Sequence, residues 1–597
     1  MTGHTVHTDS TRRSCGALRA TDAGTAVELY GWVNRRRDHG GLIFVDLRDR
    51  DGITQIVFDP QHPSFKDAEH LRHEDVLRVR GGVRLRPEGT LNAKIGTGEI
   101  EVGIEELEIL NRSQVPPFAV NSDDPVDENL RLEYRYLDLR RPRMQRNLRL
   151  RHRIIKTMRD FFDARDFTEI ETPMLIKSTP EGARDYLVPS RLHPGTFYAL
   201  PQSPQLLKQI SMISGFGRYM QIARCMRDED LRADRQPEFT QVDVEMSFCT
   251  QDEVLETMES CIRDVWKRVL GIDVPAFPRL SHQEAIAKYG VDKPDLRFGL
   301  ELQQVDDAFA STDFVVFRSV LDARGAIVAL RYPGGASLSR RDFDALTESA
   351  KQAGAKGMVW IALGADGVKS SAQKFIGEEH VAQLRSRCDA QTGDAILLFA
   401  DAKTTAFAVA GRMRNEVGER CNLRDPKAFR FCWVLDFPYL EIDEETGQPA
   451  PAHHPFTSPG PGQWELIDTD PLAMRAQHYD MVLNGFELGS GSIRIHKPEL
   501  QRRIFTMLGM TEEQIEQRFG FFMRALEFGA PPHGGMALGI DRIVMLACGE
   551  ENIREVIAFP KNQVGRDLMM DAPTQVPEPL LRDLYLRSTA PEPQSGR

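Results

Sequence analysis

Short runs in which apolar and polar residues alternate fill the chain from about Val27 to Leu110. Glycines and charged turns separate five of them: ELYGWVNRRR, GLIFVDLRD, GITQIVFD, VLRVRGGVRLR and GEIEVGIEELEIL. A period of two is typical of a β-strand that buries one face. Within this region a helical pattern covers only residues 66–73. Five short strands predict a small β-barrel of the oligonucleotide-binding kind.

The second of these runs, GLIFVDLRD, indicates which face of the barrel binds a partner. Ile43, Val45 and Leu47 share one face and are predicted to be core. Phe44 points the other way, close to the arginines 35–37. Considered alone, Phe44 is more typical of a partly covered surface residue. An aromatic ring among arginines is also how such barrels stack single-stranded bases, so we predict a nucleic-acid-binding face here.

Longer patterns begin after residues 116–145, which we interpret as a hinge because residues 116–128 are rich in proline and aspartate. Apolar residues with helical spacing run from Leu148 to Phe162 and predict an amphipathic helix. The basic sequence RLEYRYLDLRRPRMQRNLRLRHR leads into this helix. Next to a nucleic-acid-binding barrel, it favours contacts with phosphates over a merely solvated face. FTEIETPML then predicts a strand that is broken at Pro173.

Two predicted strands, YMQIARC and QVDVEMSF, enclose a loop dense in charges of both signs. In the second strand the even positions from 242 to 248 are apolar, whereas Gln241, Asp243 and Glu245 share the other face. An exposed hairpin with solvated ion pairs would explain the charges alone. Hydrophobic strands on both sides indicate desolvated charge instead, which needs a ligand or tight pairing. We therefore predict a polar binding site here.

Composition sets limits on these interpretations. A chain of 597 residues is too long for one core and predicts three or four domains. There is no apolar run long enough to span a membrane, and MTGHTVHTDSTRRSC lacks the apolar core of a secretory signal. Eight scattered cysteines without a C-x-x-C pair favour a reducing cytoplasm and argue against a zinc site. A net charge of −12 does not indicate a nucleic-acid binder, so RNA must bind at local basic patches.

The charged loop resembles a known motif. Arg227-Asp228-Glu229 and the later RQPEF closely resemble the second signature motif of class II aminoacyl-tRNA synthetases. The sequence LRADRQPEFTQVD is similar in particular to that of the bacterial aspartyl enzymes in subclass b of this family. The resemblance implies that Arg227 contacts the α-phosphate of ATP, Glu229 holds the adenine amine and Phe239 stacks on adenine. Asp228 and Gln236 are implied as further ATP contacts.

Two other segments resemble the remaining motifs of this family. GAPPHGGMALGIDRIVMLACG resembles the third, which implies ATP contacts from Gly539, Ile540, Asp541 and Arg542, with Arg542 on the γ-phosphate. Asp480 and Glu487 match the carboxylates that hold Mg²⁺ on ATP, and such sparse carboxylate sites suit Mg²⁺. FTEIETPML resembles the first motif, which forms the dimer interface, so a homodimer is implied. Neither a P-loop nor a dinucleotide glycine motif is present.

Further matches concern the amino acid L-aspartate. Lys208 lies in the apolar stretch QLLKQISMI, so it is predicted to be buried against an anion, either the substrate carboxylate or an internal Asp or Glu. Asp243 matches the carboxylate that receives the substrate ammonium, and Arg494 matches the arginine that clamps the substrate side chain. The adjacent histidines 453 and 454 are poorly placed to bind one metal ion together. The alternative to their binding aspartate is a structural role. The implied aspartate-binding residues are Glu181, Ser203, Gln205, Lys208, Arg227, Asp243, His453, His454 and Arg494.

In the resembling family the barrel reads the anticodon of tRNA(Asp). The implied tRNA-binding residues are Arg35, His39, Phe44, Gln55 and Glu99. A histidine at the place of His39 is associated with members that also charge tRNA(Asn). It could equally be an ordinary exposed loop residue of a strict enzyme, so tRNA(Asn) stays open as a substrate.

The resemblance predicts a multidomain α+β protein. It has an OB-fold barrel, a class II catalytic core on an antiparallel sheet, and an α+β insertion without recognisable site residues. The predicted divisions are 1–115 for the barrel, 116–145 for the hinge, 146–295 and 431–563 for the catalytic core, 296–430 for the insertion and 564–597 for a C-terminal extension. The implied activity is ATP-dependent ligation of aspartate to tRNA, with Arg227, Glu229 and Arg542 as catalytic residues. Two alternatives are a sister enzyme for asparagine or lysine and an inactive RNA-binding paralogue.

Overall fold

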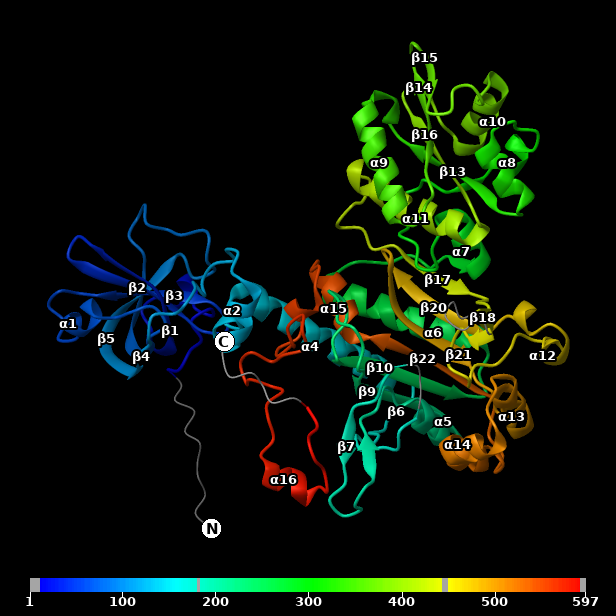
Figure 1. Cartoon of the computed structure of the whole chain (residues 1–597). Coiled ribbons are helices and arrows are strands. Elements are labelled where there is room, and N and C mark those ends of the chain that lie inside the picture. Colours follow the sequence, from blue (N-terminus) through cyan, green and yellow to red (C-terminus); the bar gives the residue numbers. More distant parts are fainter. Residues whose placement is uncertain (1–10, 180–182, 443–448, 591–597) are drawn as a thin grey trace. The chain divides into compact units, whose positions relative to one another are not determined.

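The computed structural model describes residues 11–179, 183–442 and 449–590 (Figure 1). Contacts between Cα atoms divide the chain into two compact units. The first comprises Met1–Arg149 with Ile557–Thr574, and the second comprises Leu150–Val556 with Gln575–Arg597. The barrel belongs to the first unit and all three synthetase-like motifs belong to the second.

The first unit contains the predicted barrel. Its strands close in the order β1-β2-β3-β5-β4, and their bounds are β1 Ala26–His39, β2 Leu42–Arg48, β3 Ile53–Phe58, β4 Val76–Leu85 and β5 Ile100–Asn111. Ile43, Val45 and Leu47 are fully buried, as their alternation predicted. The helical pattern at 66–73 yields only one short helix, α1 (Phe65–Glu69).

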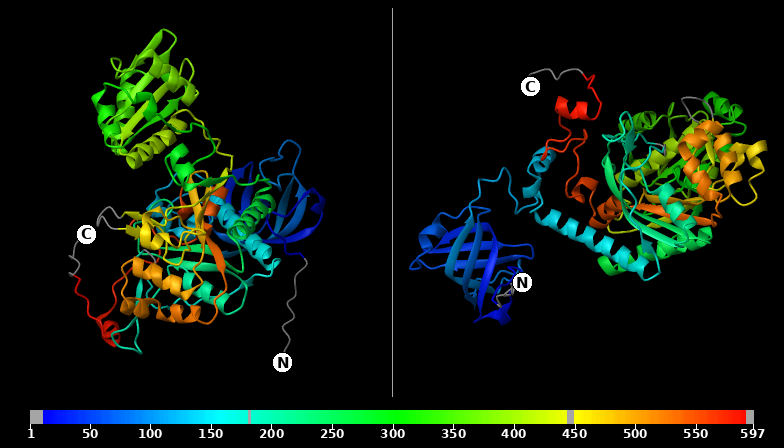
Figure 2. Two further views of the ribbon diagram at one scale, coloured as in Figure 1. Left: turned by 90° about the vertical axis from the view of Figure 1, so that its right-hand side faces the viewer. Right: turned by 90° about the horizontal axis from the view of Figure 1, so that it is seen from below.

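The stretch interpreted as a hinge is folded. It holds α2 (Glu128–Glu133) and α3 (Arg135–Asp138) and leads into α4 (Pro142–Asp163), a single long helix that is visible in Figure 2. The fully buried Asp138 lies among three arginines and accepts a hydrogen bond from Arg131 Nε at 2.9 Å. Arg135 also donates to the carbonyl oxygens of Ile557 and Ala558, at 2.8 and 2.9 Å. Part of the C-terminal region is thereby tied to this unit.

The second unit is built on an eight-stranded sheet in the order β11-β17-β20-β21-β22-β10-β9-β6. All neighbours are antiparallel except the edge strands β11 and β6. The bounds are β6 Thr168–Glu169, β9 Arg218–Met226, β10 Glu238–Ser247, β11 Arg279–Ser281, β17 Phe431–Leu435, β20 His478–Leu483, β21 Phe486–Ile493 and β22 His533–Gly539. The two predicted strands beside the charged loop are confirmed as β9 and β10.

Two details of these strands differ from the sequence expectation. FTEIETPML contributes only the two residues of β6 to the sheet. Phe248 was expected on the buried face of β10, but the strand ends at Ser247 and Phe248 is 79% exposed with φ +55°. The chain turns here because α6 (Gln251–Val265) begins at once, with Thr250 and Glu253 forming a capping box.

The segment 303–401 forms a separate antiparallel sheet, ordered β12-β13-β16-β14-β15. Helices lie on both of its faces, with α9 and α11 on one side and α8 and α10 on the other (Figure 1). The two central strands, β13 and β16, are therefore buried on both faces. The bounds are α8 Val315–Asp322, α9 Arg340–Gln352, α10 Glu378–Cys388, α11 Lys403–Arg420, β12 Gln303–Gln304, β13 Ala326–Tyr332, β14 Val359–Gly364, β15 Gly367–Ser370 and β16 Ala395–Asp401.

Several features are absent from the described part of the chain. No helix there combines the length and the apolar character needed to cross a membrane. All eight cysteines are free thiols. Among residues 11–179, 183–442 and 449–590, no three His, Cys, Asp or Glu side chains are grouped so that they could hold a metal ion.

Candidate active site

The charged loop after β9 and the strands β10, β21 and β22 enclose a cleft of about 270 Å³. Strand register explains why distant motifs meet here, since Gln241 of β10 pairs with Gly539 of β22, and Gly489 of β21 pairs with Leu538. Most of the residues predicted to bind ATP line this cleft: Arg227, Glu229, Gln236, Phe239, Glu487, Gly539, Asp541 and Arg542.

One end of the cleft suits a flat base next to a phosphate. The guanidinium carbon of Arg227 lies 5.1 Å from the centre of the Phe239 ring. Its buried Nε atom has no hydrogen-bond partner among the described residues. Glu229 is held near the same loop by Arg235, at 3.2 Å. A ring face, a cation with an open donor and an adjacent carboxylate match the needs of an adenine and its α-phosphate.

Arg542 opens α15 (Ile540–Cys548), the helix that follows β22. Its Nη2 atom donates to Asp234 at 3.0 Å and its Nη1 atom donates to the carbonyl oxygen of Glu487. The buried Nε atom has no partner in the described ranges. The guanidinium is therefore held in place with one donor open to an anion in the cleft.

The other predicted ATP contacts differ in their surroundings. Asp541 lines the cleft, but its carboxylate accepts hydrogen bonds from Arg151 Nη1 at 2.6 Å and from the Thr240 backbone at 2.8 Å. It thereby ties α15 to α4 and β10. Ile540 is fully buried, and the exposed Asp228 has Arg184 Nε at 3.8 Å. Neither lines the cleft, so their contacts with ATP stay predictions.

Asp480 and Glu487 lie on the neighbouring strands β20 and β21. Burial raises the pKa of Asp480 to about 8. Burial and the charge of Asp480 together raise the pKa of Glu487. His478 Nε2 lies 2.9 Å from Asp480 Oδ1, and burial lowers the pKa of this histidine to about 3, so it brings no positive charge. Two carboxyl groups that resist ionisation side by side are a suitable donor set for a divalent cation.

A second constellation of charges lies under the same sheet face and is almost completely buried. Lys208 Nζ, on α5 (Gln205–Ile213), lies 3.1 Å from Asp243 Oδ1 and 3.3 Å from Glu245 Oε2. Arg494 donates two hydrogen bonds to the Glu245 carboxylate, from Nε at 2.8 Å and from Nη2 at 3.2 Å. Of the two partners that the sequence left open for Lys208, the internal carboxylates are therefore present.

Two polar atoms in this constellation have no hydrogen-bond partner among the described residues. They are Asp243 Oδ2 and Gln205 Nε2, one acceptor and one donor. Burial raises the pKa of Asp243, even though Lys208 opposes this. One open acceptor and one open donor suit an amino acid, which brings an ammonium and a carboxylate.

Sequence reasoning placed Glu245 on the polar face of the predicted site, two residues after Asp243, but gave it no role. Burial favours protonation of Glu245, but the charges of Arg494 and Lys208 outweigh it and lower the pKa. Glu245 links both cations and fixes their spacing. The alternation in QVDVEMSF indicated the face that Glu245 shares with Asp243, opposite the valines, but not its two cationic partners.

Gly535 of β22 makes room for the Glu245 carboxylate, because a Cβ atom at position 535 would lie 2.1 Å from Glu245 Oε2 and 2.1 Å from the Val244 carbonyl oxygen. We expect Gly535→Ala to lower the free energy of unfolding by about 1–3 kcal/mol, the usual cost of overpacking, and to displace Glu245. Urea denaturation measures the first effect and the KM for the amino acid measures the second. Gly357→Ala is the control, since nothing lies within 4 Å of that Cβ position. Equal stability of the two variants would contradict the expectation.

Comparisons with known proteins agree with this geometry. A family model described as tRNA synthetases class II (D, K and N) matches residues 127–563, which include the cleft and the buried charges. The chain belongs to the class II tRNA synthetases. A second model, for an OB-fold nucleic acid binding domain, matches residues 27–110, the barrel of this synthetase.

Relatives of this synthetase match over nearly their whole length. An aspartate–tRNA(Asp/Asn) ligase of Moorella thermoacetica is 52% identical over 578 residues, covering 96% of each chain. One of Rubrobacter xylanophilus is 52% identical over 581 residues, covering 97% of each. Among solved structures, a putative aspartyl-tRNA synthetase of Leishmania major aligns with a TM-score of 0.59 at 19% identity, over 94% of this chain and 96% of the other. At that identity the last match shows the fold.

Three residues predicted at the amino-acid site of the synthetase have contacts of different kinds. His454 Nε2 lies 2.8 Å from Arg494 Nη1, whereas the His453 ring stacks on His478 with centroids 3.5 Å apart. The adjacent histidines thus face different partners. Burial lowers the pKa of His453 to about 2 and that of His454 well below its ordinary value, so both are neutral. Ser203 Oγ accepts a hydrogen bond from the Gln205 backbone at 3.3 Å.

Glu181, the remaining residue predicted for aspartate, lies outside the described residues. Its contact with the substrate therefore stays a prediction.

On the barrel of the synthetase, the polar network next to Phe44 differs from the predicted set. Gln55 is only 6% exposed, and its Nε2 donates to Glu101 Oε2 at 2.9 Å while its Oε1 accepts from Arg37 Nη2 at 3.1 Å. Arg37 pairs with Phe44 in the β1–β2 register. The oriented side chains are thus Arg37, Gln55 and Glu101.

The other predicted tRNA contacts, Arg35, His39 and Glu99, are exposed side chains, and their roles stay predictions. The alternation within GEIEV could have indicated Glu101, because residues 99 and 101 are two apart and so lie on the same face of a strand.

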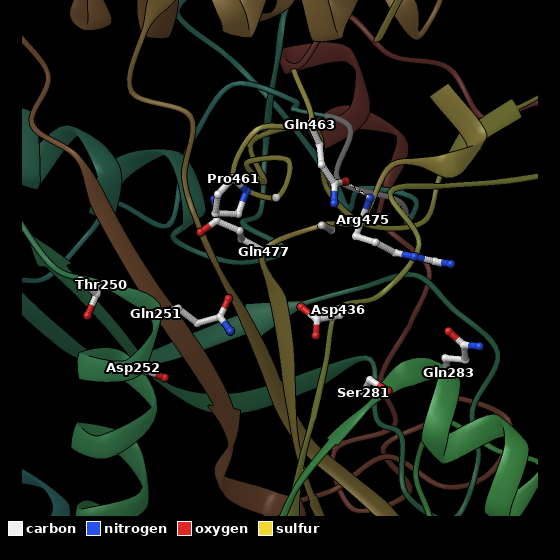
Figure 3. Close-up of a pocket in the computed structure, with 12 residues that line it drawn as sticks. Thr250, Gln251, Asp252, Ser281, Gln283, Asp436, Pro461, Gln463, Arg475 and Gln477 are labelled. Carbon is white, nitrogen blue, oxygen red and sulfur yellow. Dashed lines mark hydrogen bonds between the residues drawn. The ribbon is translucent and has the colours of Figure 1, made fainter. Parts of the chain in front are cut away.

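A further polar cleft of about 530 Å³ opens where α6 and α7 (His282–Tyr289) begin (Figure 3). Asp436, Arg475 and several glutamines line it, and the Arg475 backbone donates to Gln463. It contains none of the residues predicted for ATP, aspartate or tRNA.

Proposed function

We propose that this synthetase is an aspartate–tRNA ligase that activates L-aspartate with ATP. The observation that carries the proposal is the buried set Lys208, Arg494, Glu245 and Asp243 beside the ATP cleft. Two cations share Glu245, so a substrate carboxylate can join them, and the open oxygen of Asp243 can receive the substrate ammonium. The curated relatives that are about half identical bear the same activity in their names.

In the first step the α-carboxylate of aspartate attacks the α-phosphorus of ATP in line. A new oxygen–phosphorus bond forms, the bond to the bridging oxygen breaks, and pyrophosphate leaves with the electron pair. Catalysis depends on positioning and charge neutralisation rather than on a protein base. Arg227 supports the α-phosphate, Arg542 supports the leaving pyrophosphate, and Phe239 and Glu229 orient the adenine.

Mg²⁺ fits this reaction as a partner of ATP, and Asp480 with Glu487 would hold it. Burial raises the pKa of both carboxyl groups, and the charge of Asp480 raises that of Glu487 further, so a divalent cation would favour their ionised forms. When bound, the ion supplies Lewis-acid stabilisation of the phosphate oxygens. The protein's part is to hold both carboxylates on adjacent strands, with Arg542 attached to the Glu487 backbone.

In the second step the terminal ribose hydroxyl of tRNA attacks the carbonyl carbon of aspartyl-adenylate. The new ester forms as the mixed-anhydride bond breaks and AMP leaves. The barrel face around Phe44 would select the tRNA, with Arg37, Gln55 and Glu101 reading base edges and Phe44 stacking. We propose tRNA(Asp) and tRNA(Asn) as substrates, because relatives of similar length are named for both.

ATP–pyrophosphate exchange with aspartate, asparagine and lysine tests this function most directly. We expect exchange with aspartate and at least a thousandfold less with the other two, since a site built for a charged group discriminates by roughly 10⁴ or more. Exchange with asparagine or lysine alone would identify a sister enzyme. Absence of exchange with any amino acid would identify an inactive RNA-binding paralogue.

The exposed His39 gives a prediction about tRNA choice. A histidine can donate or accept a hydrogen bond and so tolerate either base at the third anticodon position. We expect His39→Leu to reduce charging of tRNA(Asn) roughly tenfold, the loss of one hydrogen bond of about 1 kcal/mol or more, with charging of tRNA(Asp) unchanged. Aminoacylation of the two purified tRNAs measures the ratio. An equal ratio of tRNA(Asn) to tRNA(Asp) charging in the wild type and in His39→Leu would contradict this role of His39.

We infer that the synthetase works as a homodimer, as members resembling it through the first motif do. Exposed apolar side chains after α4 support this, because Met174 is 38%, Leu175 51% and Phe197 45% exposed. Large apolar side chains left exposed are typical of an interface where they gather on one surface. Sedimentation equilibrium at micromolar protein gives the test, and a monomer at that concentration would contradict the inference.

A further inference from the structure

His478 lies on β20 two residues before Asp480, so the two side chains share one face of the sheet. The register of β20 with β21 places them beside different parts of the site. Asp480 stands opposite Ser490, which lines the ATP cleft. His478 stands opposite Ser492, whose Oγ accepts a hydrogen bond from Arg494 Nη1 at 2.6 Å. Two positions of one strand thus lie between the ATP cleft and the arginine of the predicted aspartate pocket.

On one side, His478 contacts the carboxyl group of Asp480. The Nε2 and Oδ1 atoms lie 2.9 Å apart, and both side chains are buried. A carboxylate that binds a cation only accepts hydrogen bonds, so Nε2 is the donor to it. The other ring nitrogen, Nδ1, is buried and has no hydrogen-bond partner among the described residues. The hydrogen bond to Asp480 therefore fixes how the imidazole ring is oriented.

On its other side, the same ring stacks on His453. The ring centroids lie 3.5 Å apart and the planes are nearly parallel, at 9°. The buried Phe437 packs edge-on against both rings, with its centroid 5.3 Å from that of His453 and 4.9 Å from that of His478. The position of His453 therefore depends on the ring of His478.

The stacked pair leads on to the aspartate pocket. His453 is followed directly by His454, whose Nε2 lies 2.8 Å from Arg494 Nη1. Arg494 is the residue that we assign to the side-chain carboxylate of aspartate. A continuous series of contacts therefore runs from Asp480 through His478 and the two adjacent histidines to Arg494. Packed and hydrogen-bonded series of this kind can carry energetic coupling between two sites.

We propose that His478 is a positioning residue that couples the two substrate sites, holding Asp480 by a hydrogen bond and His453 by ring stacking. The proposal rests on the proposed activation of aspartate by ATP with Mg²⁺. Binding of ATP with Mg²⁺ fixes the Asp480 carboxylate, and His478 passes this order on to the histidines and Arg494. Aspartate then meets a pocket that is already arranged, so each substrate tightens the binding of the other. The alternative is that the stacked rings only fill the core.

The test is the affinity for aspartate, measured by calorimetry on the full chain with and without Mg²⁺ and an ATP analogue whose α–β bridge cannot be cleaved. For the wild type we expect the analogue to tighten aspartate binding at least about fivefold, a typical coupling between sites. His478→Phe keeps a stacked ring but loses the hydrogen bond to Asp480. In this variant we expect an unchanged affinity for aspartate alone and a coupling factor below about two.

The complementary change is His478→Gln, which keeps an N–H donor but loses the stacked ring. We expect aspartate alone to bind about two- to tenfold more weakly, the loss of one ring contact. His282→Phe is the matched control. His282 packs against Phe437 with centroids 4.9 Å apart, but it lies outside the series of contacts between Asp480 and Arg494. Its affinity for aspartate and its coupling factor should equal those of the wild type.

Three results would overturn the proposal. The first is a wild type without coupling, or an equal coupling factor in the wild type and His478→Phe, even if the variant melts at a lower temperature. The second is an equal loss of coupling in His282→Phe, since the effect would then not pass through the hydrogen bond to Asp480. The third is wild-type affinity for aspartate in His478→Gln, since the stacked ring would then have no part.

Failure of the proposed function gives a different result. Pyrophosphate exchange shows which amino acid is activated, and that amino acid is used in the binding measurements. If it were asparagine, aspartate would be the wrong substrate, and loss of coupling between asparagine and the analogue in His478→Phe would still support the role of His478. If exchange with aspartate were normal and coupling were equal in both proteins, the function would stand and the role of His478 would be lost.

Discussion

Replacing Arg542 by alanine should reduce aspartate-dependent pyrophosphate exchange by roughly 10²–10³-fold, the usual effect of removing one preorganised donor from developing charge. Asp234 and the Glu487 carbonyl oxygen hold the guanidinium, so it needs no rearrangement to meet an anion. Its buried Nε atom has no hydrogen-bond partner in the described part of the chain. Alanine removes the charge and all of these bonds together.

Binding of tRNA should change little in the same variant, because the barrel residues belong to the other unit of the chain. Filter binding of labelled tRNA(Asp) measures this. Arg502→Ala is the control, since Arg502 is an exposed arginine paired with Glu512. Undiminished exchange in Arg542→Ala would remove its assignment to ATP. A parallel loss of tRNA affinity would indicate general misfolding.

Replacing Lys208 by methionine should remove the preference for aspartate over asparagine, which we expect to exceed about 10⁴ in the wild type. The lysine ammonium, only 1% exposed, is the shared partner of Asp243 and Glu245. Without it, two buried carboxylates face one arginine, and a third carboxylate from the substrate meets repulsion. Removing one partner of a buried pair also costs about 3–5 kcal/mol of stability.

The double change Lys208→Met with Asp243→Asn separates these two effects. It restores the balance of charge, so the unfolding free energy measured in urea should recover much of the loss. Aspartate activation should stay low, because neither the side-chain carboxylate nor the ammonium has its partner. If Lys208→Met kept the wild-type preference for aspartate over asparagine, the role assigned to Lys208 would be wrong.

Patterns of burial that repeat along the chain were predictable from sequence. The barrel strands alternate, so Ile43, Val45 and Leu47 could be assigned to the core before any coordinates. The class II motifs were recognisable because ligand contact restricts residue type at fixed spacing. The helices α2 and α3 were missed because they are only six and four residues long, and their stability comes from tertiary contacts such as Arg135 with the Ile557 carbonyl.

Which side chains pair with one another was the harder part of the site to predict. Lys208 was expected to be buried, but sequence alone could not decide whether a substrate or Glu245 would balance it. On the barrel, Gln55 was found, whereas Arg37 and Glu101 were missed because only the closed sheet brings three strands together at this point. The insertion offered no motif that could assign it a part in the site.

The pairing inside the aspartate pocket also has a kinetic consequence. Two cations face two carboxyl groups there, so the pocket projects little net field into solvent. Encounter with aspartate should therefore be governed by diffusion and fit, with little dependence on ionic strength. We expect the tRNA instead to meet exposed arginines of the barrel, so its binding should weaken steeply as added salt removes the gain from counterion release. Added salt should therefore weaken the binding of tRNA far more than that of aspartate. A change in ionic strength would then slow the transfer step while leaving the activation step nearly unchanged.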